Sequence, residues 1–258
     1  MSGNIKKFRI ISYKAKAKPV LEIKNVSKSF DGLPVLKNLN LKILPGSING
    51  LLGENGSGKT TLFNLILGTL RVDKGEIFAK NHTIISTMAI HDRCKRFKIA
   101  YVPQRISLML GMTAADNLIG IAELLLKDRR KINEICDRLL TEFSLLDVAN
   151  IRANDLSGGQ KKKLSIARAL IGDPDIILFD EIFAALSPKI IETIKKLIAN
   201  LQTSRKSLTI LLSDHIWQHV TELSDIVHIL SGGEIIRSLK PADVVKDERA
   251  RAEYFGNI

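Results

Sequence analysis

The chain has 258 residues, which suits one large α/β domain with an ample core, and it contains no apolar run of about eighteen residues that could span a bilayer. Its formal net charge of +12 suits nucleic acid, anionic lipid or an acidic partner, and does not choose among them. Cys94 and Cys136 are isolated and lack metal-ligand spacing, as is typical of reduced thiols in a cytoplasmic protein.

Part of the positive charge lies at the amino end. Residues 1–18 hold five lysines and one arginine, but they lack the uninterrupted apolar core and small-residue cleavage site of a secretory signal. We expect a solvated, disordered basic arm here, with a membrane-surface anchor as the alternative.

Alternating apolar residues next predict two half-buried strands, at residues 20–23 and 39–43. Asp31 and Gly32 are typical of a turn between the segments that flank them. Phe30 lies just before this turn. Its ring could stack on a nucleobase or belong to the core, and the sequence does not decide between these interpretations.

Residues 53–61 read Gly-Glu-Asn-Gly-Ser-Gly-Lys-Thr-Thr and match the pattern G-x-x-x-x-G-K-[ST]. A short apolar segment precedes them and an apolar helix face follows, so strand, loop and helix occur in the order that phosphate binding needs. We expect backbone N–H groups, Lys59 and the Thr60 hydroxyl to bind nucleoside triphosphate and Mg²⁺. The predicted nucleotide contacts are Gly53, Asn55, Gly56, Ser57, Gly58, Lys59, Thr60 and Thr61.

Short strands are predicted between residues 75 and 84, followed by a polar helix that ends near Arg96. Residues 99–104 are typical of a buried strand ended by proline, with Gln104 at its end. Apolar stripes with helical spacing then predict that residues 105–154 form an all-helical insert in the α/β core.

Leu-Ser-Gly-Gly-Gln at residues 156–160 is predicted to open a helix, because Ser157 is a good N-cap and an apolar stripe follows. A helix amino end with a serine and two glycines is a second candidate anion site, formed by Ser157, Gly158, Gly159 and Gln160. Nearly the same letters recur at residues 230–234, between two alternating segments. There we expect only a hairpin turn.

Two later strands are predicted to end in polar residues. Residues 175–181 run four apolar side chains into Asp180 and Glu181, which indicates an internal parallel strand with acids at its carboxyl end. Parallel α/β sheets bind ligands at that end. Residues 208–212 are predicted to bring Ser213, Asp214 and His215 to the same edge.

These motifs, in this order, resemble the ATP-binding subunits of ABC transporters from about Val20 onward. The resemblance implies a P-loop, RecA-like α/β fold with a small antiparallel β part and a helical subdomain. It places the core at residues 19–104 and 155–258, within a nucleotide-binding domain of residues 19–258. It also implies an ATP-driven head-to-tail homodimer, in which residues 156–160 of one subunit close the ATP site of the other.

The resemblance further implies a role for each polar residue of the site. Thr60, Gln104 and Asp180 would hold Mg²⁺, and Glu181 would act as general base or position the attacking water. Lys59 and His215 would contact the phosphates. The implied cofactors are ATP and Mg²⁺.

Within that family the closest similarity is to the ATPases of lipopolysaccharide export, on residues 101–104, 183–188 and 254–256. ATPases of branched-chain amino acid importers share much of this pattern, and a soluble ABC ATPase outside transport is another alternative. The transporter interpretation implies transmembrane permease partners, a position on the cytoplasmic face of the inner membrane, and no nucleic-acid partner.

Two residues depart from the family pattern. Ile182 stands where a proline is usual, and Ser187 stands where an aspartate is usual. Ser187 is the best support for a last alternative, a nucleotide-binding scaffold without turnover. Residues 106–112 form an apolar stretch that we expect either to receive a helix of the membrane subunit or to pack inside the insert.

Overall fold

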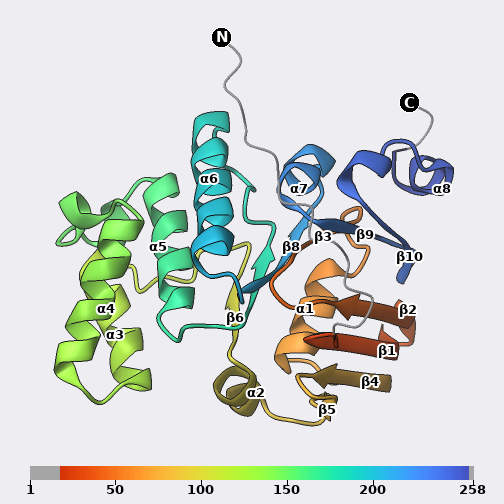
Figure 1. The fold of residues 1–258 in the computed structure, drawn as a ribbon, viewed down its shortest axis with the longest axis horizontal. Coiled ribbons are helices and arrows are strands. Elements are labelled where there is room, and N and C mark those ends of the chain that lie inside the picture. Colours follow the sequence, from red (N-terminus) through yellow and green to blue (C-terminus); the bar gives the residue numbers. More distant parts are fainter. Residues whose placement is uncertain (1–17, 256–258) are drawn as a thin grey trace.

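The structure is a computed structural model that describes residues 18–255, so the predicted basic arm lies almost wholly outside the described residues. Its main sheet has six strands in the order β10-β9-β3-β8-β7-β6 (Figure 1). All neighbouring strands pair in parallel except β10, which is antiparallel to β9. The strands are β3 (Ile48–Leu52), β6 (Ile99–Val102), β7 (Ile176–Asp180), β8 (Thr209–Asp214), β9 (Ile226–Ser231) and β10 (Glu234–Leu239).

Strands β3, β7 and β8 are buried along their whole length, as expected for parallel strands covered on both faces. Their side chains alternate between two cores. Ile176 and Leu178 belong to the core that contains α1 (Lys59–Leu67), whereas Ile177 and Phe179 belong to the core beneath the long helices. The prediction of an internal parallel strand ending in two acids is therefore confirmed.

A second, antiparallel sheet has the order β2-β1-β4-β5 and packs on the other side of α1 (Figure 1). Its strands are β1 (Leu21–Phe30), β2 (Leu33–Ile43), β4 (Lys74–Ala79) and β5 (Thr83–Ile84). Asp31 and Gly32 join β1 to β2 with φ of 49° and 79°, the positive values that two-residue hairpin turns need. The predicted turn is thus confirmed.

The helical part lies at one side of the molecule, beside α5 (Gly158–Leu170) and α6 (Pro188–Ser204) (Figure 1). It holds α3 (Ala114–Leu125) and α4 (Arg129–Glu142). Thr113 forms a capping box with Asp116 at the start of α3. Both helices fall within the predicted insert, while residues 105–113 contain no helix; the domain boundaries themselves stay predictions.

The remaining elements are short. The main ones are α2 (Ile90–Phe97) and α7 (Trp217–Leu223), and single turns complete the chain: Leu146–Val148, Ala153–Asp155, Pro241–Asp243, α8 (Glu248–Ala250) and Arg251–Phe255. No helix in residues 18–255 is both long and apolar enough to cross a membrane.

Candidate functional site

The phosphate loop joins β3 to α1 and needs its glycines. Gly56 and Gly58 have φ of 82° and 106°, which side chains rarely adopt, and a Cβ at Gly53 would lie 2.5 Å from the Ser57 hydroxyl oxygen. In residues 18–255 no side chain caps the amino end of α1, so its first N–H groups remain available to an anion. Within the described residues the buried Ser57 hydroxyl has no partner either. A loop with these unpaired donors fits a phosphate ligand.

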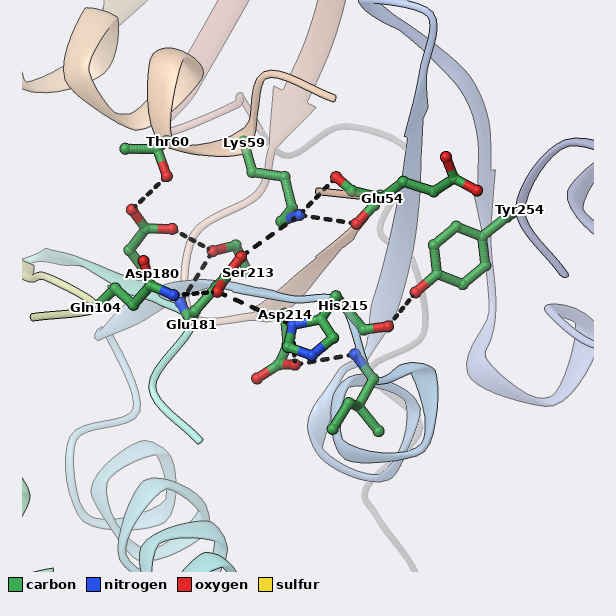
Figure 2. A network of polar contacts seen from close by, with 12 residues as sticks. Glu54, Lys59, Thr60, Gln104, Asp180, Glu181, Ser213, Asp214, His215 and Tyr254 are labelled. Atoms are coloured by element: carbon green, nitrogen blue, oxygen red, sulfur yellow. Dashed lines mark hydrogen bonds and ion pairs between the residues drawn. The ribbon is translucent and has the colours of Figure 1, made fainter. Parts of the chain in front are cut away.

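Lys59 points back across this loop (Figure 2). Its ammonium donates to the carbonyl oxygens of Gly53 at 2.8 Å and Glu54 at 3.0 Å, and it lies 3.7 Å from a carboxylate oxygen of Glu181. Burial lowers the pKa of Lys59, and the negative charge of Glu181 opposes that effect. Lys59 therefore presents a buried positive charge beside the loop.

Asp180 is fully buried and accepts three hydrogen bonds. The donors are the hydroxyls of Ser213 at 2.7 Å, Thr60 at 2.9 Å and Tyr101 at 3.1 Å. Burial and the charge of Asp180 both raise the pKa of Tyr101, which keeps that phenol a donor. The contact between the Thr60 hydroxyl and the Asp180 carboxylate brings together two oxygen ligands of the kind that Mg²⁺ prefers.

Glu181 lies at the centre of the remaining polar residues (Figure 2). Its backbone has φ of 43°, an uncommon value for a residue with a side chain, and its N–H donates to the Ser213 carbonyl at 3.0 Å. Its carboxylate accepts from the Gln104 amide at 2.5 Å, and His215 Nδ1 lies 3.9 Å away. The structure thus brings Lys59, Gln104, Glu181 and His215 into one cluster.

The predicted helix start at Ser157 is confirmed. Ser157 caps α5 in a reciprocal pair with Gln160, whose side chain accepts from the Ser157 N–H at 2.8 Å. Ser157 and Gly158 are exposed, whereas a Cβ at Gly159 would lie 2.8 Å from Ile190 of α6. Within the described residues, no hydrogen bond or ion pair joins residues 156–160 to the phosphate loop of the same chain.

Phe30 is 41% exposed, so the alternative that it is a core residue is wrong. The Lys28 ammonium lies 5.4 Å from the centre of its ring, in cation–π contact. Stacking of Phe30 on a nucleobase stays a prediction.

Beside the phosphate loop the structure has a cleft of about 310 Å³ that the sequence did not predict. Its walls are residues 54–57 of the loop, Pro34, Val35 and Lys37 of β2, the hairpin residues 230–233, and Tyr254. The Gly232–Gly233 turn forms the predicted hairpin. It also borders the nucleotide loop, because residues 230–233 and 54–57 line the same cleft. The Gly233 carbonyl accepts from the Lys37 N–H of β2 at 2.9 Å.

Tyr254 makes a contact that the sequence did not reveal. Its hydroxyl donates to the backbone carbonyl of His215 at 2.5 Å (Figure 2). Burial raises the pKa of Tyr254 to about 12, with the charges of Asp214 and Glu54 acting in the same direction. No local pattern reveals this contact, because 39 positions separate Tyr254 from His215.

A glycine loop at a helix start, a buried lysine on it and acids at the end of the adjoining parallel strand define a P-loop nucleotide-binding protein. The family model described as ABC transporter matches residues 36–184. The chain belongs to the ABC transporter ATP-binding family.

Relatives of known name extend the match over nearly the whole chain. The lipopolysaccharide export system ATP-binding protein LptB of Haemophilus influenzae is 33% identical over 240 residues, which is 92% of this chain and 97% of that protein. LptB of Escherichia coli strain K12 is 33% identical over 239 residues, with the same coverage. An uncharacterised ABC transporter ATP-binding protein of Rhizobium meliloti is 35% identical over 248 residues, covering 95% of this chain and 89% of that protein.

Solved structures agree with the fold. The ADP conformation of the ATP-binding cassette MJ1267 has a TM-score of 0.82 at 25% identity and covers 93% of this chain and 99% of that one. A dimeric, post-hydrolysis state of the cassette MJ0796 bound to ADP and phosphate has a TM-score of 0.77 at 28% identity, covering 86% and 98%.

The fold class predicted from the sequence is therefore confirmed, and so is the ABC transporter resemblance. The chain is an ATP-binding, ATP-hydrolysing subunit of an ABC transporter. Subunits of this family pair with membrane components of the transporter, and cassettes of the family form dimers.

Proposed function

We propose that this ATPase energises lipopolysaccharide export through a separate transmembrane subunit, from the cytoplasmic face of the inner membrane. One observation carries the proposal. The relatives named for lipopolysaccharide export match 92% of this chain and 97% of their own length at 33% identity. The resemblance to that branch at residues 101–104, 183–188 and 254–256 also supports the proposal.

Hydrolysis is proposed to occur around Glu181. Thr60 and Asp180 would hold Mg²⁺, with the side-chain oxygen of Gln104 as a further ligand; the bound ion would compensate charge on the transferring phosphoryl group. Lys59 would neutralise phosphate oxygens from the other side. The Glu181 carboxylate, held by Gln104, would accept a proton from the attacking water or orient it.

His215 is proposed to contact the γ-phosphate. It follows β8 directly, its side chain is 41% exposed, and its Nδ1 lies within 3.9 Å of both Glu181 and Asp214. A ring so placed can turn toward a phosphate oxygen while its backbone stays fixed by Tyr254.

The complete site is proposed to need two copies of the chain, arranged head to tail. The exposed Ser157 and Gly158 support this arrangement, because their helix end is an anion site without a ligand from its own phosphate loop. Under this proposal Glu181→Gln, which binds ATP without rapid turnover, elutes as a dimer with ATP in size-exclusion chromatography. Adding Ser157→Arg should return it to a monomer, and a persistent dimer in the double variant would contradict the arrangement.

The export proposal is tested by isolating the chain from membranes in mild detergent together with its membrane subunits. The complex is then placed in liposomes that contain lipopolysaccharide. We expect ATP-dependent extraction of lipopolysaccharide in the wild type and none in Glu181→Gln. Uptake of branched-chain amino acids by the same vesicles, without extraction of lipopolysaccharide, would assign the chain to an importer instead.

A further inference from the structure

Two side chains of helix α5 donate hydrogen bonds to the segment that follows β6. Near its start, the Lys162 ammonium donates to the backbone carbonyl of Gln104 at 3.2 Å. Nearly two turns later, Arg168 donates to the backbone carbonyl of Ser107 at 2.5 Å. Both acceptors belong to a segment without regular structure, so this segment takes its position from α5.

Lys162 is an unusual residue for this task, since its side chain is almost fully buried, at 2% exposure. Among the described residues, Gln104 supplies the hydrogen-bond acceptor for its ammonium, which could donate three bonds. Burial lowers the pKa of Lys162, and the charge of Asp180 opposes that effect. An apolar side chain of similar length would fill this space without the cost of burying a charge.

The backbone and the side chain of Gln104 make different contacts. Its backbone carbonyl accepts from Lys162, while its side-chain amide donates to the Glu181 carboxylate at 2.5 Å. A displacement of the backbone at this residue would therefore displace the amide that donates to Glu181. The chain of contacts runs from α5 through Lys162 and Gln104 to the acid at the end of β7.

We propose that Lys162 is a positioning residue for hydrolysis, which acts by holding the backbone of Gln104 so that its amide reaches Glu181. The inference deepens the proposed function and rests on the catalytic role given there to Glu181. It has a further consequence for coupling. Because Ser157 caps the start of α5, any shift of that helix end moves Lys162 and hence the contact between Gln104 and Glu181.

The test is a double-mutant cycle in the full-length chain, with kcat and KM for ATP as the readout. Lys162→Met keeps the length of the side chain and removes the donor. We expect kcat to fall about tenfold while KM changes less than about twofold, because the substituted residue touches no phosphate. Lys163→Met, one position further along the helix, removes the same charge and should keep wild-type kinetics.

Gln104→Ala keeps the backbone carbonyl that Lys162 binds but removes the amide that reaches Glu181. If Lys162 acts through that amide, Lys162→Met should lower kcat by less than about twofold in the Gln104→Ala background. Independent, multiplied losses in the double variant would overturn the inference. If Lys162 only stabilised the fold, Lys162→Met would lower the melting temperature and leave the kcat of the folded fraction unchanged.

Two additional variants make the outcome unambiguous. Lys162→Gln retains a donor and replaces Lys162→Met if the latter fails to fold. Glu181→Gln in the same assay separates this inference from the proposed function. Retained turnover in Glu181→Gln refutes the proposed site, whereas lost turnover there combined with a multiplicative cycle refutes only the role of Lys162.

Discussion

His228 provides a measurable link between pH and the stability of the main sheet. It lies on β9 with 2% exposure, and its ring joins three strands. Nδ1 lies 2.8 Å from the Ser238 hydroxyl on β10, and Nε2 lies 3.2 Å from the side-chain oxygen of Asn49 on β3. The Asn49 amide nitrogen donates to Ser47, so its oxygen faces the ring and accepts from Nε2–H. This network fits the neutral imidazole.

Burial lowers the pKa of His228 from 6.5 to about 4. Between these values the unfolded chain binds a proton that the folded chain does not, so stability falls as the pH falls through this window and is fully present above pH 6.5. A shift of this size corresponds to roughly 3 kcal/mol over the whole window. Between pH 7 and pH 5 it predicts a loss of about 2 kcal/mol from this residue alone.

The assay is urea unfolding of the wild type and of His228→Leu at a series of pH values from 7 to 5. His228→Leu is less stable at pH 7, because it leaves Asn49 and Ser238 without their partner. Since all other groups titrate alike in both proteins, the difference between the two free energies isolates His228. It should shrink by about 2 kcal/mol on going to pH 5. A difference that is independent of pH would show that the folded protein protonates His228 without penalty and would refute the reasoning.

Three further predictions concern turnover and assembly. Lys59→Ala should weaken ATP binding and turnover together, whereas Glu181→Gln should keep binding and lose hydrolysis; near-wild-type turnover in both would contradict the assigned roles. Leu110→Asp should release the membrane subunit in pull-down assays yet keep basal ATPase activity, because Leu110 is 47% exposed and the fold tolerates a charge there. Leu108 is only 9% exposed, so Leu108→Asp should instead cost roughly 3 kcal/mol or more of folding free energy. Ser187→Asp should raise the ATPase rate or its Hill coefficient. Ser187 is the N-cap residue of α6, but its side chain makes no capping hydrogen bond. A higher melting temperature without a change in kinetics would therefore indicate helix capping and contradict a role in coupling.

Much of the fold could be predicted from the sequence because its signals are local. The strand before the phosphate loop, the loop and its helix adjoin one another, and the N-cap of α5 lies three residues from its partner Gln160. An unbroken apolar run likewise predicts a buried parallel strand. Each of these features needs only a few consecutive residues to be recognised.

The hydrogen bonds around Asp180 depend on strand register, which cannot be predicted from any local sequence pattern. Asp180 of β7 pairs with Ser213 of β8, and Tyr101 of β6 pairs with Leu178, which lies on the same face as Asp180. These pairings bring two hydroxyls to one buried carboxylate from positions 33 and 79 residues away. Similarly, the sequence could not divide residues 106–112 into parts, whereas the structure buries Leu108 and exposes Leu110.

The repeated Leu-Ser-Gly-Gly letters show how context decides both local structure and use. At residues 156–160 an apolar stripe follows, so the serine caps a helix. At residues 230–233 a strand precedes and another follows, so Gly232 and Gly233 take φ of 57° and 87° and form a turn. The turn needs these glycines for close packing as well, because a Cβ at Gly233 would lie 2.6 Å from the Val35 carbonyl oxygen, in the wall of the cleft beside the phosphate loop. The second copy therefore belongs to the surroundings of the nucleotide loop through its packing, although it has no helix end with which to bind an anion.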